Sequence, residues 1–363
     1  MKLVNELFFS LIFFIIVSAC SQNQEMQTQS VPIKIGFLGP LTGSQAVYGQ
    51  WGREGVEFAN ASNIKIIYED SQCDPKVGLS AFTKLTELDN VDGIISSDCS
   101  SPTIAYGTVA QQKSIPVIVV AANSPIISNI GDFVFRIRYS SEQDGKALAD
   151  FANKQGWKNL AILYQDNDAG RGYAAETKKN YQGTIVAEEN YVLASASDVR
   201  VQLAKIQTRN PDVLVVLSQG DDGAVILKQI KEAGIKSPLL TSGTAFPQST
   251  IAAAGASAEG LYTTVGMYES DQWQKGSEFK EKFNEQTGKN GAYFVALGYD
   301  AANLFSQIAT TCGKDKTCIR TQLANTKLYE GASGEITFDE KGELITGSLR
   351  MRQWRNGSWN VVS

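Results

Sequence analysis

The chain contains five cysteines and no histidine, which limits the chemistry that its side chains can perform. The lack of histidine excludes serine–histidine–aspartate triads, cysteine–histidine nucleophiles and histidine metal sites. No two cysteines form a CxxC pair, so the sequence predicts no zinc site. Carboxylate or lysine chemistry is still open, but no nucleophile–base pair is visible. We therefore expect a protein that is not an enzyme and that binds no metal or cofactor.

The first cysteine, Cys20, closes an apolar leader over residues 7–17. This run is shorter than the roughly 20 residues that a membrane-spanning helix needs, and it is typical of a signal-peptide core. A cysteine directly after small residues resembles the lipobox of bacterial lipoproteins, in which that cysteine carries the lipid. Residues 1–20 are therefore predicted to be a lipoprotein signal peptide, and the rest of the chain to be exported and lipid-anchored to the bacterial cell membrane. The alternative is a plain secretory signal. Ser21 leaves sorting to the outer membrane open.

The other four cysteines form an even set in a chain that is predicted to be exported, which indicates two disulfides. Sequence order alone permits three pairings of four thiols. We favour the two local pairs, Cys73 with Cys99 and Cys312 with Cys318. The first bridge would close a loop of about 25 residues and contribute roughly 3 kcal/mol to stability.

Two serines stand where a predicted strand runs into a predicted helix. Residues 98–103 read Asp-Cys-Ser-Ser-Pro-Thr, and Pro102 suits the first helical turn. Backbone N–H groups at a helix start, together with the hydroxyls of Ser100 and Ser101, could hold a carboxylate. The alternative interpretation is ordinary capping of the helix.

The elements that must position these residues alternate between strand and helix. Residues 21–30 are polar and read as a flexible tether. The apolar Val/Ile/Leu runs beyond them suit parallel strands that are buried on both faces, and the alternation predicts α/β units. Predicted strands are 33–38, 64–68, 93–96, 116–121, 133–138, 160–164, 184–191, 213–217, 239–241 and 260–265, with a short β tail over 334–338 and 349–361. Predicted helices are 48–61, 75–88, 102–112, 142–155, 170–181, 198–209, 222–234, 272–287, 292–310 and 316–326.

Length and charge narrow the class of protein further. The roughly 340 residues after the leader predict two domains. The net charge is −5 and the basic residues form no long run, so nucleic acid is not an expected partner. One stretch, IGFLGPLTG, has glycines after a strand as a dinucleotide-binding loop does. It lacks the GxGxxG spacing and contains Pro40, so we reject nucleotide binding.

An ordered set of segments resembles the Leu/Ile/Val-binding branch of the type I periplasmic binding proteins. These segments are IKIGFLGPLTGSQAVYGQ, YEDSQCDP, VDGIISSDCSSPT, IPVIVVAANSP, ILKQIKEAGI, ASAEGLY, ALGYDAANLF and GEITFDEKGEL. The resemblance implies two Rossmann-like lobes joined by a three-crossing hinge, with a small ligand in the cleft between them. It also implies the Cys73–Cys99 bridge. Lobe 1 would comprise 31–137 and 270–338 and lobe 2 would comprise 138–269 and 339–363, with crossings near 137–140, 266–269 and 338–345.

The resemblance carries ligand roles to residues of the first lobe. Ser100 would be the main carboxylate ligand, assisted by Ser101. The backbone of Ala121 would meet a ligand amino group, and the amide of Asn123 would replace the threonine hydroxyl of the family. Tyr48 would wall the cleft, although it could equally pack on a neighbouring tryptophan.

The second lobe departs from the family pattern. Residues 242–246 lack the expected acid, and Ala169 stands where a tyrosine is expected. A buried ligand ammonium needs a charged or hydrogen-bonded partner, so the acids at nearby loops become candidates. Gln219 takes the place of an aromatic residue over the ligand. The candidate acids are Asp221, Asp222 and Asp300, and without an ammonium the ligand would be held by Ser100, Ser101, Asn123 and Thr244.

The resemblance therefore implies a solute-binding lipoprotein of an ABC importer, monomeric, which takes an amino acid or similar small carboxylate and delivers it to a membrane permease. The alternative to transport is a regulatory or sensory lipoprotein with the same fold, which would act as a receptor or as an activator of cell-wall synthases. An adjacent permease gene would favour transport, whereas an apolar cleft that cannot close would favour regulation.

Overall fold

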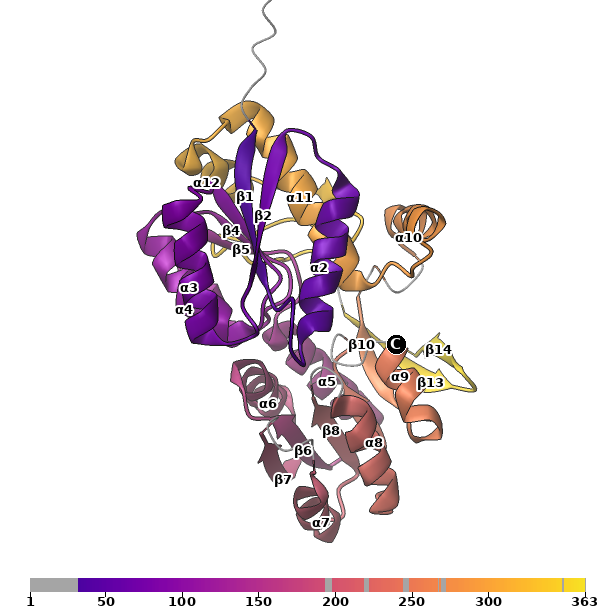
Figure 1. The fold of residues 1–363 in the computed structure, drawn as a ribbon. Coiled ribbons are helices and arrows are strands. Elements are labelled where there is room, and N and C mark those ends of the chain that lie inside the picture. Colours follow the sequence, from indigo (N-terminus) through magenta and orange to yellow (C-terminus); the bar gives the residue numbers. More distant parts are fainter. Residues whose placement is uncertain are drawn as a thin grey trace, which may run out of the picture. The chain divides into compact units, whose positions relative to one another are not determined.

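A computed structural model describes residues 32–192, 198–218, 222–243, 248–266, 268, 272–347 and 349–362. These residues form two sheets (Figure 1). The first sheet has the order β2-β1-β3-β4-β5, and all its strands are parallel. Its strands are β1 (Ile33–Gly39), β2 (Ile64–Asp70), β3 (Gly93–Ser96), β4 (Val117–Val119) and β5 (Val134–Arg136).

Helices cover both faces of the first sheet because its strands are apolar on both faces. We call this sheet and its helices the first lobe. Ile35, Phe37 and Ile95 pack toward one set of helices, whereas Leu38 and Ile94 pack toward the other. The helices are α2 (Ala46–Ala59), α3 (Pro75–Thr83, continued by a π-turn over Lys84–Leu88), α4 (Ser100–Gln112), α10 (Gln274–Thr287), α11 (Tyr293–Cys312) and α12 (Lys316–Ala324), with a 3₁₀ turn at Pro125–Asn129 and a small β11–β12 hairpin (Tyr329–Glu330 and Glu335–Ile336).

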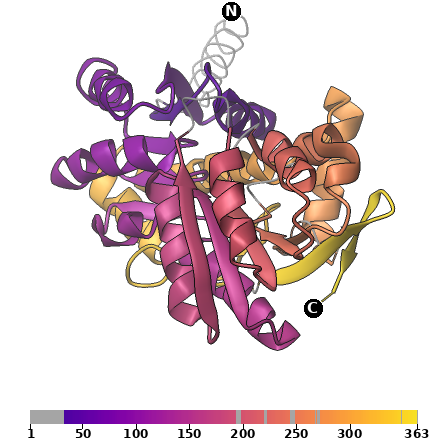
Figure 2. The ribbon, with the colours of Figure 1, turned by 90° about the horizontal axis from the view of Figure 1, so that it is seen from below.

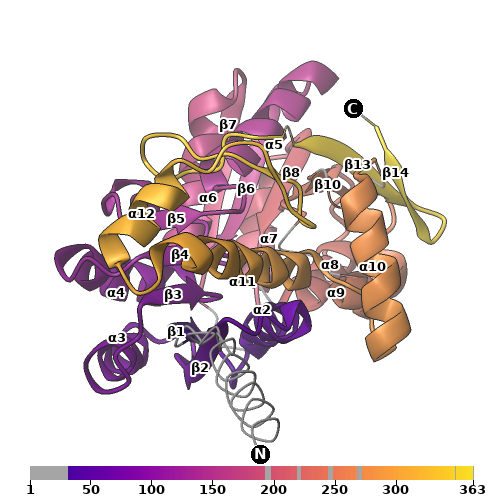
Figure 3. The same ribbon diagram turned by 90° about the horizontal axis from the view of Figure 1, so that it is seen from above.

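Two helices of the first lobe, α2 and α11, approach each other at glycines (Figure 3). A Cβ on Gly55 would lie 1.9 Å from the carbonyl oxygen of Val295, and one on Gly298 would lie 2.1 Å from that of Gly52. Only glycine leaves room for backbones at this distance. The close approach fixes α11, whose first turn carries Phe294, against the helix that carries Tyr48.

The second sheet has the order β14-β13-β10-β9-β8-β6-β7. Its core is parallel, and an antiparallel C-terminal hairpin forms one edge (Figure 2). We call this sheet and its helices the second lobe. The strands are β6 (Asn159–Gln165), β7 (Thr184–Tyr191), β8 (Val213–Leu217), β9 (Leu239–Thr241), β10 (Tyr262–Val265), β13 (Arg350–Arg355) and β14 (Ser358–Val361), and the helices are α5 (Ser141–Gln155), α6 (Asp168–Asn180), α7 (Arg200–Thr208), α8 (Asp222–Glu232) and α9 (Gln248–Ala254).

The chain passes between the two lobes three times, after β5, after β10 and after β12. The first and third crossings lie side by side, since Arg136 forms a bridge with Glu343 and donates its backbone N–H to the Gly342 oxygen at 2.7 Å. The buried Arg136 guanidinium also contacts the Glu343 carboxylate at 2.6 Å. The predicted α/β fold with two Rossmann-like lobes is thus what the structure contains.

Both predicted disulfides are present. Cys73 is bonded to Cys99 and Cys312 to Cys318. The first bridge ties the loop after β2 to the start of α4, and the second joins the end of α11 to α12. Within the described residues, no helix is long and apolar enough to cross a membrane. Cys20 lies outside the described residues.

Candidate functional site

The loops after β3 and β4 meet because these two strands are neighbours in a parallel sheet, with Ser96 paired to Val119. Ligands of such sheets bind beyond the carboxyl ends of the strands. A small cavity of about 30 Å³ lies there, next to the first crossing between the lobes. Its lining comprises Gln45, Tyr48, Asp98, Cys99, Ser100, Ala121, Ala122, Asn123, Arg138 and Phe294. Four of the predicted ligand residues therefore come together: Tyr48, Ser100, Ala121 and Asn123.

Ser100 ties the two loops to each other. Its Oγ accepts the backbone N–H groups of Asn123 at 3.3 Å and Ser124 at 3.1 Å. The residue at the N-cap of α4 is Cys99, whose side chain makes no capping bond, so Ser100 does not cap its own helix. The hydroxyl instead fixes the backbone of the loop that carries Ala121 and Asn123.

Ser101 points toward the second lobe. Its Oγ donates to Asp168 Oδ2 at 2.7 Å, and Asp168 is the first residue of α6. The other carboxylate oxygen of Asp168 accepts from Arg171 at 2.8 Å. In this conformation Ser101 thus bridges the lobes directly.

A buried polar chain also joins the lobes. The amide nitrogen of Asn123 donates to the Tyr173 hydroxyl, which lies 3.1 Å from Ser242 Oγ and 3.4 Å from Asp144 Oδ2. Thr264 donates to the other Asp144 oxygen at 2.5 Å. Burial raises the pKa of Asp144, although the Thr264 bond and the nearby charge of Arg138 oppose that shift. We call Asn123, Tyr173, Ser242, Asp144 and Thr264 the interlobe network.

Sequence reasoning missed Tyr173, although a signal was available. Ala169 stands where the family resemblance leads one to expect a tyrosine. Tyr173 lies four residues further along α6, so it shares a helix face with Ala169, and both are buried. The resemblance leads one to expect the tyrosine at position 169, whereas the structure has it at position 173, one helical turn further along α6.

Arg138 is a second residue that sequence reasoning did not assign to the site. It follows β5 in the first crossing, and its side chain lines the cavity with only 3% of the residue exposed. Nη1 donates to the Ala121 carbonyl oxygen, and Nε donates to the Tyr139 oxygen at 3.2 Å. The guanidinium carbon lies 5.3 Å from the centre of the Phe294 ring. Two arginines, Arg136 and Arg138, within the otherwise apolar and aromatic 133–139 stretch were the available signal.

Aromatic rings form one wall of the cavity. The Phe294 ring meets the Tyr48 ring edge to face at a centroid distance of 5.0 Å. It stacks on Trp51 at 6.1 Å, so Tyr48 packs both on a neighbouring tryptophan and against the cavity. The wall could receive the apolar body of a ligand.

Asp98 is the described carboxylate that lines the cavity. Its Oδ1 accepts from Ser71 Oγ at 2.7 Å and from the Cys99 N–H at 2.8 Å. Burial raises the pKa of this carboxyl to about 7, against the lowering effect of those two bonds. Asp98 is therefore partly protonated near neutral pH and provides only a weak counter-charge.

Asp300 does not line this cavity. It is fully buried in α11, where it accepts the backbone N–H groups of Ala332 and Ser333 at 2.7 Å and the Ser333 hydroxyl at 2.5 Å. Its carboxylate thus holds the turn between β11 and β12, beside a separate hollow of about 560 Å³. The structure therefore places Asp300 away from the other predicted ligand residues of the first lobe, at a turn that it stabilises. Asp222 begins α8, and the other predicted ligand residues of the second lobe, Gln219, Asp221 and Thr244, lie outside the described residues.

The comparison with known proteins decides the family. Residues 32–358 match the periplasmic binding protein family. The chain belongs to that family. A leucine-, isoleucine-, valine-, threonine- and alanine-binding protein of Pseudomonas aeruginosa is 24% identical over 339 residues, which cover 89% of this chain and 90% of the relative.

Two solved structures illustrate the shared fold. A branched-chain amino acid transporter substrate-binding protein of Streptococcus pneumoniae, in complex with isoleucine, has a TM-score of 0.82 at 24% identity and covers 91% of this chain and 99% of its own. An ABC transporter solute-binding protein of R. palustris, in complex with benzoate, has a TM-score of 0.84 at 21% identity. The match covers 92% of this chain and 96% of the R. palustris chain. Family membership confirms the prediction of a solute-binding protein and its assignment as a non-enzyme.

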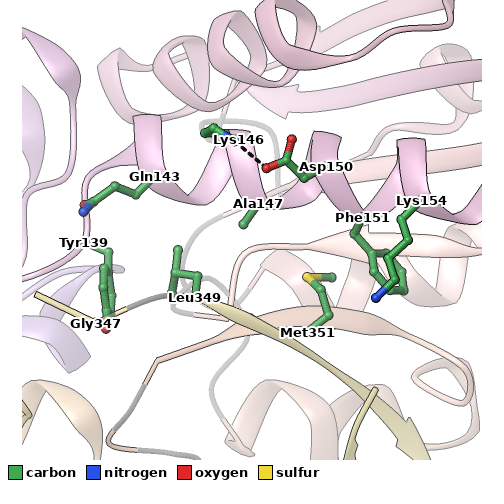
Figure 4. A pocket seen from close by; sticks show the side chains of 10 residues that line it. All are labelled: Tyr139, Gln143, Lys146, Ala147, Asp150, Phe151, Lys154, Gly347, Leu349 and Met351. Carbon is green, nitrogen blue, oxygen red and sulfur yellow. Dashed lines mark hydrogen bonds and ion pairs between the residues drawn. The ribbon is translucent and has the colours of Figure 1, made fainter. Parts of the chain in front are cut away.

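A further cavity of this periplasmic binding protein lies between α5 and the segment that carries Leu349 and Met351, and it has a volume of about 380 Å³ (Figure 4). Phe151, Leu349 and Met351 line it, and Lys146 is paired with Asp150 on its rim at 2.5 Å. None of the predicted ligand residues contributes to this cavity. The smaller cavity is the better candidate because it lies where the loops after β3 and β4 meet the first crossing, and because Asn123, which lines it, is bonded to Tyr173 of the second lobe.

Proposed function

We propose that the protein captures a small carboxylate, either an amino acid or an aromatic or aliphatic acid, between its two lobes and delivers it to an ABC importer. The single observation that carries this proposal is the convergence of Ser100, Asn123 and Arg138 on one cavity, with Asn123 also bonded to Tyr173 of the other lobe. Convergent polar groups beside an aromatic wall are typical of small-molecule sites.

The relatives support a carboxylate ligand. The Pseudomonas relative is described as a binder of leucine and other amino acids, and the two solved structures contain isoleucine and benzoate. A carboxylate is the one group that these ligands share. The amino group is absent from benzoate, so the fold alone does not decide between the two ligand types.

Capture would proceed by opening and closing of the lobes. Small-molecule sites usually have volumes of about 300–1,000 Å³. The cavity of about 30 Å³ is far smaller, so a ligand enters only when the lobes separate. We propose that lobe 1 (31–137 and 270–338) and lobe 2 (138–269 and 339–363) move about the crossings near 137–140, 266–269 and 338–345. The permease would then recognise the closed form.

The leader adds a membrane anchor to this proposal. A lipid on Cys20 would hold a monomeric binding protein at the outer face of the cell membrane, with residues 21–30 as tether. Replacement of Cys20 by serine should then release the protein or leave it unprocessed. Detergent-phase partitioning that is identical for the parent and the Cys20→Ser variant would contradict the anchor without affecting the ligand site.

A ligand screen tests capture itself. Amino acids, aliphatic acids and aromatic acids are added to the purified protein, and thermal unfolding is followed. A ligand at 100 times its dissociation constant stabilises the folded state by about 2.7 kcal/mol. Asn123→Ala should abolish the shift of any hit, whereas Thr108→Ala, an exposed position on α4, should retain it. If no carboxylate shifts the transition, the proposed function is wrong.

A further inference from the structure

The cavity of about 380 Å³ beside α5 lies where the chain connects the two lobes, and we call it the hinge cavity. Its walls come from α5, from Tyr139 in the first crossing, and from Gly347 and Leu349 in the third (Figure 4). Its volume falls within the range of about 300–1,000 Å³ that is typical of small-molecule sites. The hinge cavity therefore has room for a ligand in the conformation that the structure describes.

The first and third crossings are in close contact beside the hinge cavity. A Cβ on Gly347 would lie 2.5 Å from the Tyr139 hydroxyl oxygen, and the positive φ of +82° at this position also favours glycine. The Gln143 side chain, in the first turn of α5, accepts the Ser140 backbone N–H at 2.8 Å and donates to the Leu344 oxygen at 3.1 Å. A molecule in the hinge cavity would thus contact segments that rearrange if the lobes move about these crossings.

Apolar side chains line much of the hinge cavity. Tyr139, Phe151 and Met351 are each at most 6% exposed, and Ala147 and Leu349 complete the apolar lining. Contact with these side chains removes apolar ligand surface from water, which is favourable. The lining therefore suits an aromatic ring or a short hydrocarbon chain.

Two lysines of α5 also belong to the lining. Lys146 is turned toward Asp150, with Nζ 2.5 Å from Oδ2, whereas Lys154 extends toward the strand that carries Met351 (Figure 4). The hydrocarbon stem of a lysine can lie along apolar surface while its ammonium group stays in water. That ammonium donates hydrogen bonds and accepts none. A ligand head group that accepts hydrogen bonds, such as a carboxylate, a sulfonate or a hydroxyl, is therefore complementary to Lys154.

We propose that the hinge cavity is a second ligand site, which takes a small amphipathic molecule with its apolar body against Phe151 and Met351 and an acceptor head group near Lys154. The occupant contacts both crossings and restrains them. This site is separate from the cavity of the proposed function and does not depend on it. The alternative is a cavity that holds only water.

A fluorescent probe of this chemistry, 1-anilinonaphthalene-8-sulfonate, tests the site directly, because it combines aromatic rings with a sulfonate. We expect one probe molecule to bind per chain. Ala147→Trp, which fills the cavity, should weaken binding at least ten-fold, whereas Ala252→Trp, the same change at an exposed position of α9, should leave it unchanged. Equal binding by these two variants overturns the proposal. Loss of binding in Asn123→Ala also overturns it, because the probe would then occupy the cavity of the proposed function.

Lys154 is tested at an exposed position, so this test holds even if Ala147→Trp does not fold. Lys154→Gln should weaken probe binding at least five-fold, and Lys154→Arg should retain most of it because donors and charge remain. Lys228→Gln, an exposed lysine on α8, is the matched control and should bind as the parent does. Unchanged binding by Lys154→Gln overturns the role of Lys154.

Hydrogen exchange measures the effect on the crossings. Saturating probe should slow exchange of the backbone amides at 137–139 and 344–347 in the parent, because a bound molecule that contacts both crossings opposes their local opening. The same amides should exchange at an unchanged rate in Ala147→Trp. Probe binding that leaves these amides unaffected in the parent overturns the restraint on the crossings.

Discussion

Side chains that line the cavity also hold its loops in place. Asp98 is an example, because its buried carboxyl accepts hydrogen bonds from Ser71 and Cys99, and burial changes its pKa. Its carboxyl is 1% exposed, and burial raises its pKa from 3.8 to about 7. A raised carboxyl pKa means that the folded state prefers the protonated form.

The pH dependence of stability should therefore change on replacement of Asp98 by asparagine. Below about pH 4 the carboxyl is protonated in the folded and in the unfolded state, so its burial does not lower the free energy of unfolding there. As the pH rises from about 4 to 7, the unfolded state ionises first, so the free energy of unfolding falls. The rise of the Asp98 pKa from 3.8 to about 7 corresponds to a loss of unfolding free energy of at most about 4 kcal/mol.

Asp98→Asn should thus be more stable than the parent at pH 8 and similar to it at pH 4, because the amide oxygen can still accept from Ser71 and Cys99. Urea unfolding at both pH values measures this. Asp150→Asn, an exposed acid on α5, is the control and should change neither value appreciably. If the free energy of unfolding changes with pH in the same way for Asp98→Asn and for the parent, the raised pKa of Asp98 is contradicted.

Ser100 offers a second test at the level of one side chain. Because its Oγ accepts two backbone N–H groups, Ser100→Ala should lower the free energy of unfolding by about 1–3 kcal/mol and also weaken ligand binding. Thr108→Ala on the exposed face of the same helix should cost under about 0.5 kcal/mol. Identical unfolding curves for the two variants would show that the loop does not depend on Ser100.

The helices and strands were largely predictable, and the reasons are physical. Strands such as Thr184–Tyr191 and Leu239–Thr241 agree with the predicted bounds because Gly, Pro and polar residues flank their apolar runs. The helix Gln248–Ala254 was missed because a seven-residue, alanine-rich segment has no clear apolar period. Its start follows residues that the structure leaves undescribed.

The site was only partly predictable. Ser100, Ala121 and Asn123 could be predicted because they lie in loops after parallel strands, and ligands of such sheets bind at the carboxyl ends of the strands. The sequence analysis did not include Arg138, and it did not foresee the structural contacts of Asp300. The position of Arg138 in the cleft depends on how the first crossing turns, and the use of Asp300 by the turn at 331–333 depends on a contact 32 residues away. The Asp300 contact leaves no local pattern in the sequence, whereas the charges within residues 133–139 were a signal for Arg138 that does not by itself locate its side chain.

The two disulfides differ in the length of chain that they close, and their removal should differ accordingly. The Cys73–Cys99 bridge spans a sequence separation of 26 and the Cys312–Cys318 bridge one of 6. Loop-closure entropy predicts a loss of about 3.5 kcal/mol for the first and about 2 kcal/mol for the second. The double variants Cys73→Ser/Cys99→Ser and Cys312→Ser/Cys318→Ser, compared by urea unfolding, measure this.

The first of these variants should also weaken ligand binding, because Cys99 precedes the serines of the cavity, whereas the second bridge lies at the far end of α11 and should leave affinity unchanged. A larger loss of stability for the short loop would contradict the entropic account.

At the scale of the whole molecule, direct hydrogen bonds between described residues join the two lobes. Ser101 to Asp168 and Asn123 to Tyr173 are two of them, and both lie beside the cavity. Contacts that are made only when the lobes meet bias the balance between open and closed forms. Tyr173 is the more informative of the two second-lobe partners, because its hydroxyl reaches Asn123 in one lobe and Ser242 and Asp144 in the other.

Tyr173→Phe should therefore shift the balance toward the open form. The loss of a hydrogen bond that contributes about 1 kcal/mol changes an equilibrium roughly five-fold. We expect a larger radius of gyration in small-angle scattering without ligand, and weaker ligand affinity because closure contributes less. Tyr181→Phe is the matched control, since it removes a hydroxyl that donates to Trp157 at 2.9 Å within the second lobe alone. Both variants lose a phenol hydroxyl that is hydrogen-bonded in the parent, so both should lose some stability. If both variants leave the scattering curve and the affinity equally unchanged, the Asn123–Tyr173 bond does not govern closure, and the crossings alone must set the balance between the two forms.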